Sequence, residues 1–321
     1  MDVPYINQQS LKSAFDLLQL PVTEFLRRSS PDWIIYDYTS HWLPPVATEL
    51  GIKKAFFSLF NASALTTPDD FTVVPPWIPF ESDIVFRYHE VARYIEKTEE
   101  DVTGISDSVR FGYSIGGNIL LFSYICIKTG LSDRFLPPPV SEDHEDDGDA
   151  TWARIKEWLD KQRLNSVVYV SLGTEARKSR GTRYGSCWLV PQVKILSHES
   201  VGGFLTHCGW NSVVEGLGFG RVPIFLPVLN EQGLNTRLLR GKDIGVEIPR
   251  NERDGMFWSD SVRLAMIDDA GELKRTKAKM MKGLFGNRDE NILYVDELID
   301  YMKSKGSSHV GRNYVCIARF I

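Results

Sequence analysis

Short apolar runs alternate with amphipathic stretches along most of the chain. Apolar runs of strand length occupy residues 33–36, 55–59, 166–173 and 201–205. Helical periodicity occupies residues 10–26, where Pro21 interrupts it, and residues 42–50 and 152–159. Strands that alternate with helices predict an α/β fold, in which helices cover both faces of a parallel sheet.

The same pattern occurs twice, with a linker between the two occurrences. Three prolines at positions 137–139 precede a run of acidic residues at 141–149, which is typical of a stiff turn followed by a solvated segment. A strand that ends at Gly173 then starts a second α/β unit. We therefore expect one domain at residues 1–136, a linker at residues 137–150 and a second domain at residues 151–321.

The apolar run at residues 201–205 leads directly into a candidate anion site. It stops at the turn 206–209, and a helical pattern then opens with Asn211 and Ser212 and carries Glu215 one turn inside. Unpaired N–H groups and the positive end of the helix dipole favour an anion at such a turn, and Gly209 lets a ligand approach the backbone. With His207 and Ser212 as further donors, the pattern predicts a nucleotide diphosphate site.

Composition narrows the class of protein further. A net charge of −5, without a basic stripe, argues against a nucleic-acid partner. The four cysteines lie far apart and form no C-x-x-C pair, which argues against a disulfide framework or a zinc site. The longest apolar stretch, residues 119–127, is too short to span a bilayer. We expect a cytoplasmic protein without a metal or an integral membrane segment.

The residues around the turn resemble a known motif, the donor-binding box of plant secondary-product UDP-glycosyltransferases. The box occupies 44 positions from Leu189 to Gln232, and the matching residues are Gln192, His198, Gly202-Gly203-Phe204, His207-Cys208-Gly209-Trp210-Asn211-Ser212, Glu215-Gly216 and Glu231-Gln232. Residues 31–52, 77–91, 167–175 and 279–291 are similar to the subgroup that glycosylates flavonoid and terpenoid glycosides, rhamnosyltransferases and glucosyltransferases among them.

The resemblance implies a GT-B fold, with two Rossmann-like domains facing each other across a cleft, both incomplete in this chain. The first domain would bind the acceptor, a flavonoid or triterpenoid glycoside, and the second a UDP-sugar co-substrate, with no cofactor. By resemblance, Trp188 stacks on uracil, Gln192 and Glu215 bind ribose, and His207, Asn211 and Ser212 bind the diphosphate. By the same resemblance, Trp210, Glu231 and Gln232 bind the sugar. Val190 and Gly209 are also among the predicted UDP-sugar-binding residues.

The family inverts the anomeric centre by direct displacement, with a His base oriented by an Asp. Asp37, at the end of the strand at residues 33–36, matches that Asp, although a carboxylate there could also cap a turn. The matching His is absent, because the chain is expected to open after the family's first strands. His41 is the weaker alternative as the base.

Two further departures from the family keep a second hypothesis open. The family has a helix and a strand between the strand region that ends at Ala176 and the donor box, but here only residues 177–187 precede Trp188, too few for a βα unit. Residues 118–135 and 309–321 do not resemble the family. The main interpretation is an inverting UDP-glycosyltransferase acting on a hydroxyl of a small plant metabolite or its glycoside. The alternative is a catalytically inactive remnant that retains at most weak UDP-sugar binding.

Overall fold

The chain divides into two compact units. The computed structural model describes residues 5–57, 72–74, 82–95, 150–173, 190–229, 231–258, 260, 271–305 and 315–316. The first unit consists of Met1–Ala62, Ile95–Asp133 and Val295–Ile321, and the second of Ser63–Tyr94 and Arg134–Tyr294. The described residues contain no helix long and apolar enough to cross a membrane.

The units do not follow the predicted domains along the sequence. The described residues 82–94 belong to the second unit, although they precede the predicted linker, and residues 295–305 belong to the first. The predicted linker lies outside the described residues as far as position 149, and Ala150 already begins a helix. The domain boundaries therefore stay a prediction.

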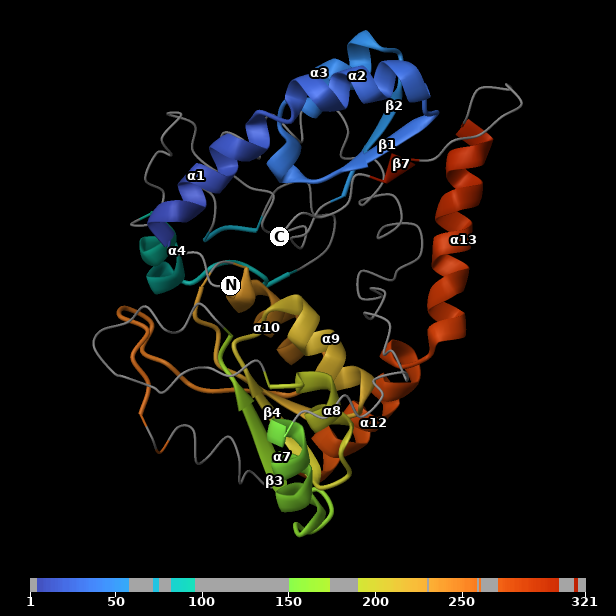
Figure 1. Ribbon diagram of the computed structural model, residues 1–321. Coiled ribbons are helices and arrows are strands. Elements are labelled where there is room, and N and C mark those ends of the chain that lie inside the picture. Colours follow the sequence, from blue (N-terminus) through green and yellow to red (C-terminus); the bar gives the residue numbers. More distant parts are fainter. Residues whose placement is uncertain are drawn as a thin grey trace. The chain divides into compact units, whose positions relative to one another are not determined.

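The first unit is built on a three-stranded parallel sheet in the order β2-β1-β7 (Figure 1). Its strands are β1 (Trp33–Tyr36), β2 (Lys53–Phe56) and β7 (Val315–Cys316). Its helices are α1 (Tyr5–Asp16), α2 (Gln19–Ser29), η1 (Tyr38–Ser40) and α3 (Leu43–Glu49), and α13 (Arg288–Lys305) reaches it with its last turns.

The sequence pattern explains most of these elements. The strand predicted at residues 33–36 is confirmed, whereas β2 begins and ends earlier than the predicted strand at residues 55–59. The helix predicted at residues 10–26 is split into α1 and α2, with Pro21 inside the first turn of α2, where its missing N–H costs nothing. For the same reason Pro44 and Pro45 are accommodated at the start of α3.

The second unit contains a four-stranded parallel sheet in the order β3-β4-β5-β6. The strands are β3 (Val167–Ser171), β4 (Val201–Thr206), β5 (Val222–Phe225) and β6 (Val246–Glu247). The helices are α4 (Tyr88–Ile95), α7 (Ala150–Asp160), α8 (Gln192–Ser197), α9 (Trp210–Gly218), α10 (Gln232–Gly241) and α12 (Gly271–Phe285).

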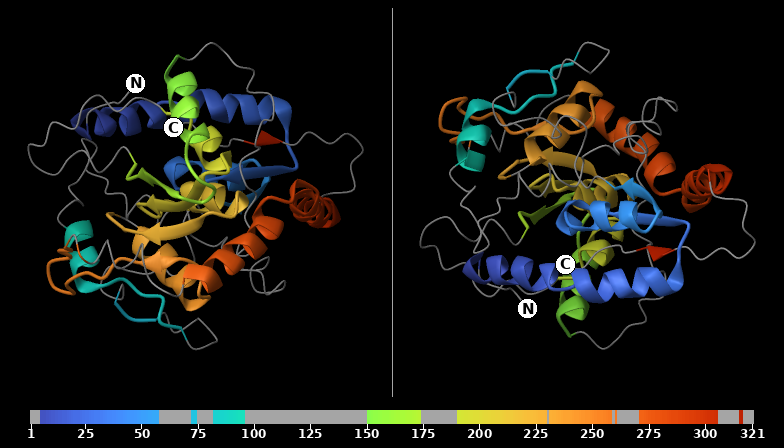
Figure 2. Two further views of the ribbon diagram at one scale, coloured as in Figure 1. Left: turned by 90° about the horizontal axis from the view of Figure 1, so that it is seen from below. Right: turned by 90° about the horizontal axis from the view of Figure 1, so that it is seen from above.

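Alternating side chains of the central strands supply two apolar clusters of this sheet. Phe225 packs with buried residues of α9, α10 and α12. Both views in Figure 2 show α12 beside this sheet. Leu205 and Ile224, which are paired in the sheet, pack with Leu226 and Ile248 in a separate cluster. The carboxyl ends of β4 and β5 are thereby fixed, and the turns that follow them carry the candidate site.

Candidate functional site

The turn after β4 is held in an uncommon backbone conformation by its neighbours. Cys208 has a φ of +70°, a left-handed conformation that non-glycine residues seldom adopt. Its N–H donates to Thr206 Oγ1 at 3.2 Å, and its carbonyl accepts a hydrogen bond from Asn235 Nδ2 at 3.1 Å. Burial raises the pKa of the Cys208 thiol to about 12, so this side chain is a packing group. Helix α10, through Asn235, thus fixes the turn.

The His207 imidazole lies close to two glycines, Gly173 after β3 and Gly209 after β4. A Cβ atom at Gly209 would lie 2.7 Å from His207 Nε2, and one at Gly173 would lie 3.0 Å from Nε2 and Cε1. Gly173 also has a φ of +70°, which favours glycine. We predicted that Gly209 allows a ligand to approach the backbone; the structure shows the imidazole of His207 in close approach there.

The first turn of α9 provides the donors expected for an anion. Gly209 is the N-cap residue and supplies no side-chain hydrogen bond to the helix. Asn211 and Ser212 lie in this first turn, at the carboxyl end of β4. N–H groups at a helix start carry partial positive charge and bind anions. The predicted diphosphate residues are therefore placed on one short segment with suitable electrostatics.

A polar cluster joins α8 to α9 beside this helix start. Gln192 Nε2 donates to Glu215 Oε2 at 2.7 Å and lies 3.3 Å from Ser212 Oγ. Arg221, directly before β5, holds the other end of α8, because its guanidinium donates to the carbonyls of Leu196, Ser197 and His198 at 2.6, 3.2 and 3.1 Å. The two predicted ribose residues, Gln192 and Glu215, are thus brought into direct contact.

The start of α10 carries the two predicted sugar-binding residues. Burial raises the pKa of the Glu231 carboxyl. Gln232 is buried, and its Oε1 accepts hydrogen bonds from the backbone N–H groups of Val228 and Leu229, both at 2.8 Å. Both lone pairs of this oxygen are used, so only the amide nitrogen of Gln232 can bind a sugar hydroxyl.

Three other predicted residues lie in different surroundings. Val190 packs against the apolar cluster that contains Leu159, Ile195 and Val201. Trp210 is partly buried and packs against the apolar cluster that contains Cys208, Val213 and Phe225. Trp188 lies outside the described residues, as does the short segment at residues 177–187.

Asp37 lies at the carboxyl end of β1, as the sequence predicted. Its Oδ1 accepts a hydrogen bond from Thr39 N at 2.9 Å and so caps η1. His41 Nδ1 lies 3.6 Å from Asp16 Oδ1, so the carboxylate that neighbours this imidazole is that of Asp16. The capping role of Asp37 is thus observed, and its catalytic role stays a prediction.

Sequence reasoning missed two residues that shape the site. Asn235 was not singled out, although it lies three positions after Gln232 and four after Glu231, so the three residues share a face at the start of α10. Gly173 was noted only as the end of a strand. The signal for Gly173 is its place just after the carboxyl end of β3. The neighbouring strand β4 leads into the turn that contains His207.

A parallel sheet with a helix that starts directly after the carboxyl end of a central strand, as α9 does after β4, is typical of α/β proteins that bind nucleotides. The family model described as UDP-glucoronosyl and UDP-glucosyl transferase matches residues 182–254. UDP-glycosyltransferase 91C1 from Arabidopsis thaliana is 60% identical, over 96% of this chain and 82% of its own length. The chain belongs to the UDP-glycosyltransferase family.

Other relatives and solved structures agree with this assignment. Soyasaponin III rhamnosyltransferase from Glycine max is 30% identical, over 94% of this chain and 80% of its own length. The crystal structure of Medicago truncatula UGT71G1 complexed with UDP-glucose covers 92% of this chain and 82% of its own, with a TM-score of 0.67 and 18% identity. The fold is GT-B. The chain is a plant glycosyltransferase that moves a sugar from a UDP-sugar to a small-molecule acceptor.

The chain is also shorter inside the aligned region than its relatives. The alignment with the Arabidopsis protein spans 379 positions, whereas this chain has 321 residues in total. The relative therefore has segments within the aligned region that this chain lacks. This agrees with the internal shortening predicted from the sequence.

Proposed function

We propose that the donor is bound along the carboxyl ends of β4 and β5. The first turn of α9 and His207 bind the diphosphate, the cluster of Gln192 and Glu215 binds the ribose, and the start of α10 binds the sugar. The chemistry of the residues supports this assignment, because the N–H groups at a helix start suit an anion and carboxylates accept hydrogen bonds from hydroxyl groups. The observation that carries the proposal is the contact of Gln192 with both Ser212 and Glu215, directly beside the turn.

In the proposed reaction, an acceptor hydroxyl attacks the anomeric carbon from the face opposite the diphosphate. The bond from this carbon to the phosphate oxygen breaks, and the glycosidic bond forms with inversion. The His that takes the hydroxyl proton in the family is absent from this chain, so the proton passes to His41 as the alternative base, and Asp37 takes the place of the family's orienting Asp. Charge that develops on the leaving phosphate is stabilised by His207 and by the N–H groups of α9. No cofactor or metal takes part.

The acceptor that we propose is a flavonoid or triterpenoid glycoside, and the proposed compartment is the cytoplasm. The name of the soybean relative, a soyasaponin III rhamnosyltransferase, supports the acceptor part of the proposal. Residues 31–52 and 77–91 resemble the enzymes that glycosylate flavonoid and terpenoid glycosides, and this similarity also supports the proposed acceptor.

Calorimetric titration with UDP tests the proposed site. Gln192→Ala removes the contact with Glu215 and one ribose ligand, and we expect UDP affinity to fall about two- to tenfold, as for the loss of a hydrogen bond to a neutral hydroxyl group. Gln162→Ala is the matched control, because Gln162 is half-buried and its side-chain amide donates to the Trp158 carbonyl, which is not part of the proposed site. Equal affinities of the two variants would remove Gln192 from the site, and a wild-type chain without UDP binding would refute the proposed site.

A further inference from the structure

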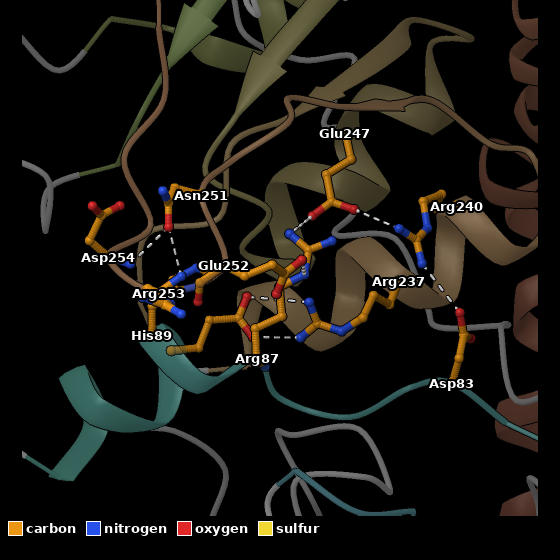
Figure 3. Close-up of polar contacts among 11 residues, drawn as sticks. Asp83, Arg87, His89, Arg237, Arg240, Glu247, Asn251, Glu252, Arg253 and Asp254 are labelled. Atoms are coloured by element: carbon orange, nitrogen blue, oxygen red, sulfur yellow. Dashed lines mark hydrogen bonds and ion pairs between the residues drawn. The ribbon is translucent and has the colours of Figure 1, made fainter.

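A segment from the first half of the sequence, residues 82–92, lies along one face of α10 (Figure 3). Near the beginning of this segment, Asp83 Oδ2 pairs with Arg240 Nη2 at 3.2 Å. Near its end, Glu90 pairs with Arg237. The segment therefore follows the helix from its last turn toward its start.

The pair between Glu90 and Arg237 is the buried part of this contact. Arg237 Nη2 lies 2.6 Å from Glu90 Oε2, and Nη1 lies 3.3 Å from Oε1, a two-point geometry. The side chains are only 12% and 3% exposed for Glu90 and Arg237. Glu90 Oε2 also accepts a hydrogen bond from Arg87 N at 2.8 Å, so the carboxylate is oriented from its own segment as well.

Gly233 shows how close Glu90 comes to the start of α10. The nearest atoms to a Cβ built at Gly233 are the three carboxylate atoms of Glu90, and they would collide with it. Gly233 directly follows Gln232 and lies one turn before Arg237. The Glu90 carboxylate thus occupies the surface of the first turn of α10, next to the two proposed sugar ligands.

Further contacts fix the segment beside α10 and β6. Arg87 Nη1 lies 2.8 Å from Glu247 Oε1, and the other oxygen of Glu247 lies 3.3 Å from Arg240 Nη1. Phe86 and Val91 pack with Leu234 of α10 in one apolar cluster. Charged and apolar groups together hold the segment in a single position.

We propose that Glu90 is a positioning residue for the sugar end of the donor site. By pairing with Arg237 and covering Gly233, it fixes the first turn of α10, and thereby Glu231 and Gln232. This inference rests on the proposed function, in which the sugar binds at α10 and the nucleotide at α8 and α9. Changes at Glu90 should therefore affect the affinity for a UDP-sugar more than the affinity for UDP.

The test compares dissociation constants for UDP and UDP-glucose in Glu90→Gln, which keeps the shape and removes the charge. We expect UDP-glucose affinity to fall about tenfold, because the first turn of α10 loses the charged hydrogen bonds that fix its two sugar ligands. UDP affinity should change less than about twofold, as for sites without shared partners. Asp83→Asn is the control within the same segment, because Asp83 is 71% exposed and its pair should contribute little.

A second pair of variants approaches the same contact from the helix. Gly233→Ala places a methyl group against the Glu90 carboxylate, whereas Gly241→Ala adds the same methyl group to the same helix, where no atom lies within 4 Å. We expect Gly233→Ala to weaken UDP-glucose binding selectively. Gly241→Ala should leave both affinities unchanged.

The outcomes separate this inference from the proposed function. Unchanged UDP-glucose affinity in Glu90→Gln and Gly233→Ala would overturn the inference. An equal loss of affinity for UDP and for UDP-glucose would also overturn it, because it would indicate that Glu90 contributes to stability alone. In either case wild-type UDP binding would still support the donor site. A wild-type chain that bound neither ligand would overturn the proposed function and this inference with it.

Discussion

Substitution of Gly209 by alanine tests the geometry of the diphosphate site. Gly209 has a φ of −58°, which alanine adopts without strain, so the change acts through its added methyl group. That group would lie 2.7 Å from His207 Nε2 and 3.2 Å from Cε1. The imidazole has little room to move, because it also lies close to Gly173, where a Cβ would lie 3.0 Å from Nε2 and Cε1. His207 must therefore leave its position beside the start of α9.

The size of the effect follows from the interaction that is lost. A hydrogen bond from His207 to a phosphate oxygen is worth about 1.5–3 kcal/mol, because the acceptor is charged. UDP affinity should then fall by about ten- to 150-fold. The stability cost should be smaller, about 0.5–1 kcal/mol, because alanine is a poorer N-cap residue than glycine.

Calorimetric titration with UDP, combined with a double-mutant cycle, measures this effect. Gly209→Ala, His207→Ala and the double variant should have similar UDP affinities, since the first change acts only by displacing His207. Gly283→Ala in α12 is the control, because its methyl group would meet no atom within 4 Å. A Gly209→Ala protein with wild-type affinity would refute the reasoning, as would losses that add fully in the double variant.

Two further predictions concern carboxylates. Asp37→Asn keeps an oxygen that can accept from Thr39 N but removes the charge, so stability should be unchanged while turnover falls about 10²-fold or more. Unchanged turnover would leave Asp37 only its capping role. The hydrogen bond from His198 is the main cause of the lowered pKa of the Asp160 carboxyl. The ionised Asp160 therefore stabilises the folded protein at pH values above its ordinary pKa of 3.8, and this contribution is lost as the pH falls through the lowered pKa. Urea unfolding at pH 5 and pH 3 should show a steeper loss for the wild type than for Asp160→Asn; parallel losses would contradict this.

The sequence by itself determined the local elements and the chemistry of the box. Strand β1 and strand β4 were predicted from apolar runs, because burial on both faces of a parallel sheet demands such runs. The start of α9 was predicted within one residue from the turn residues before it. The spacing of polar residues was sufficient to indicate the family, because a donor site needs donors and carboxylates at fixed intervals along one strand, turn and helix.

Only the tertiary structure decided which residues from distant parts of the chain meet. Gly173 and His207 are close because β3 and β4 are paired in the sheet, and the periodicity of neither strand specifies its partner. Glu90 and Arg237 are 147 positions apart, and residues 82–94 belong to the second unit although they precede the predicted linker. Charged side chains in a sequence usually indicate a solvated surface. The burial of Glu90 and Arg237 as a pair depends on the packing of the segment against α10, which removes both charges from water together.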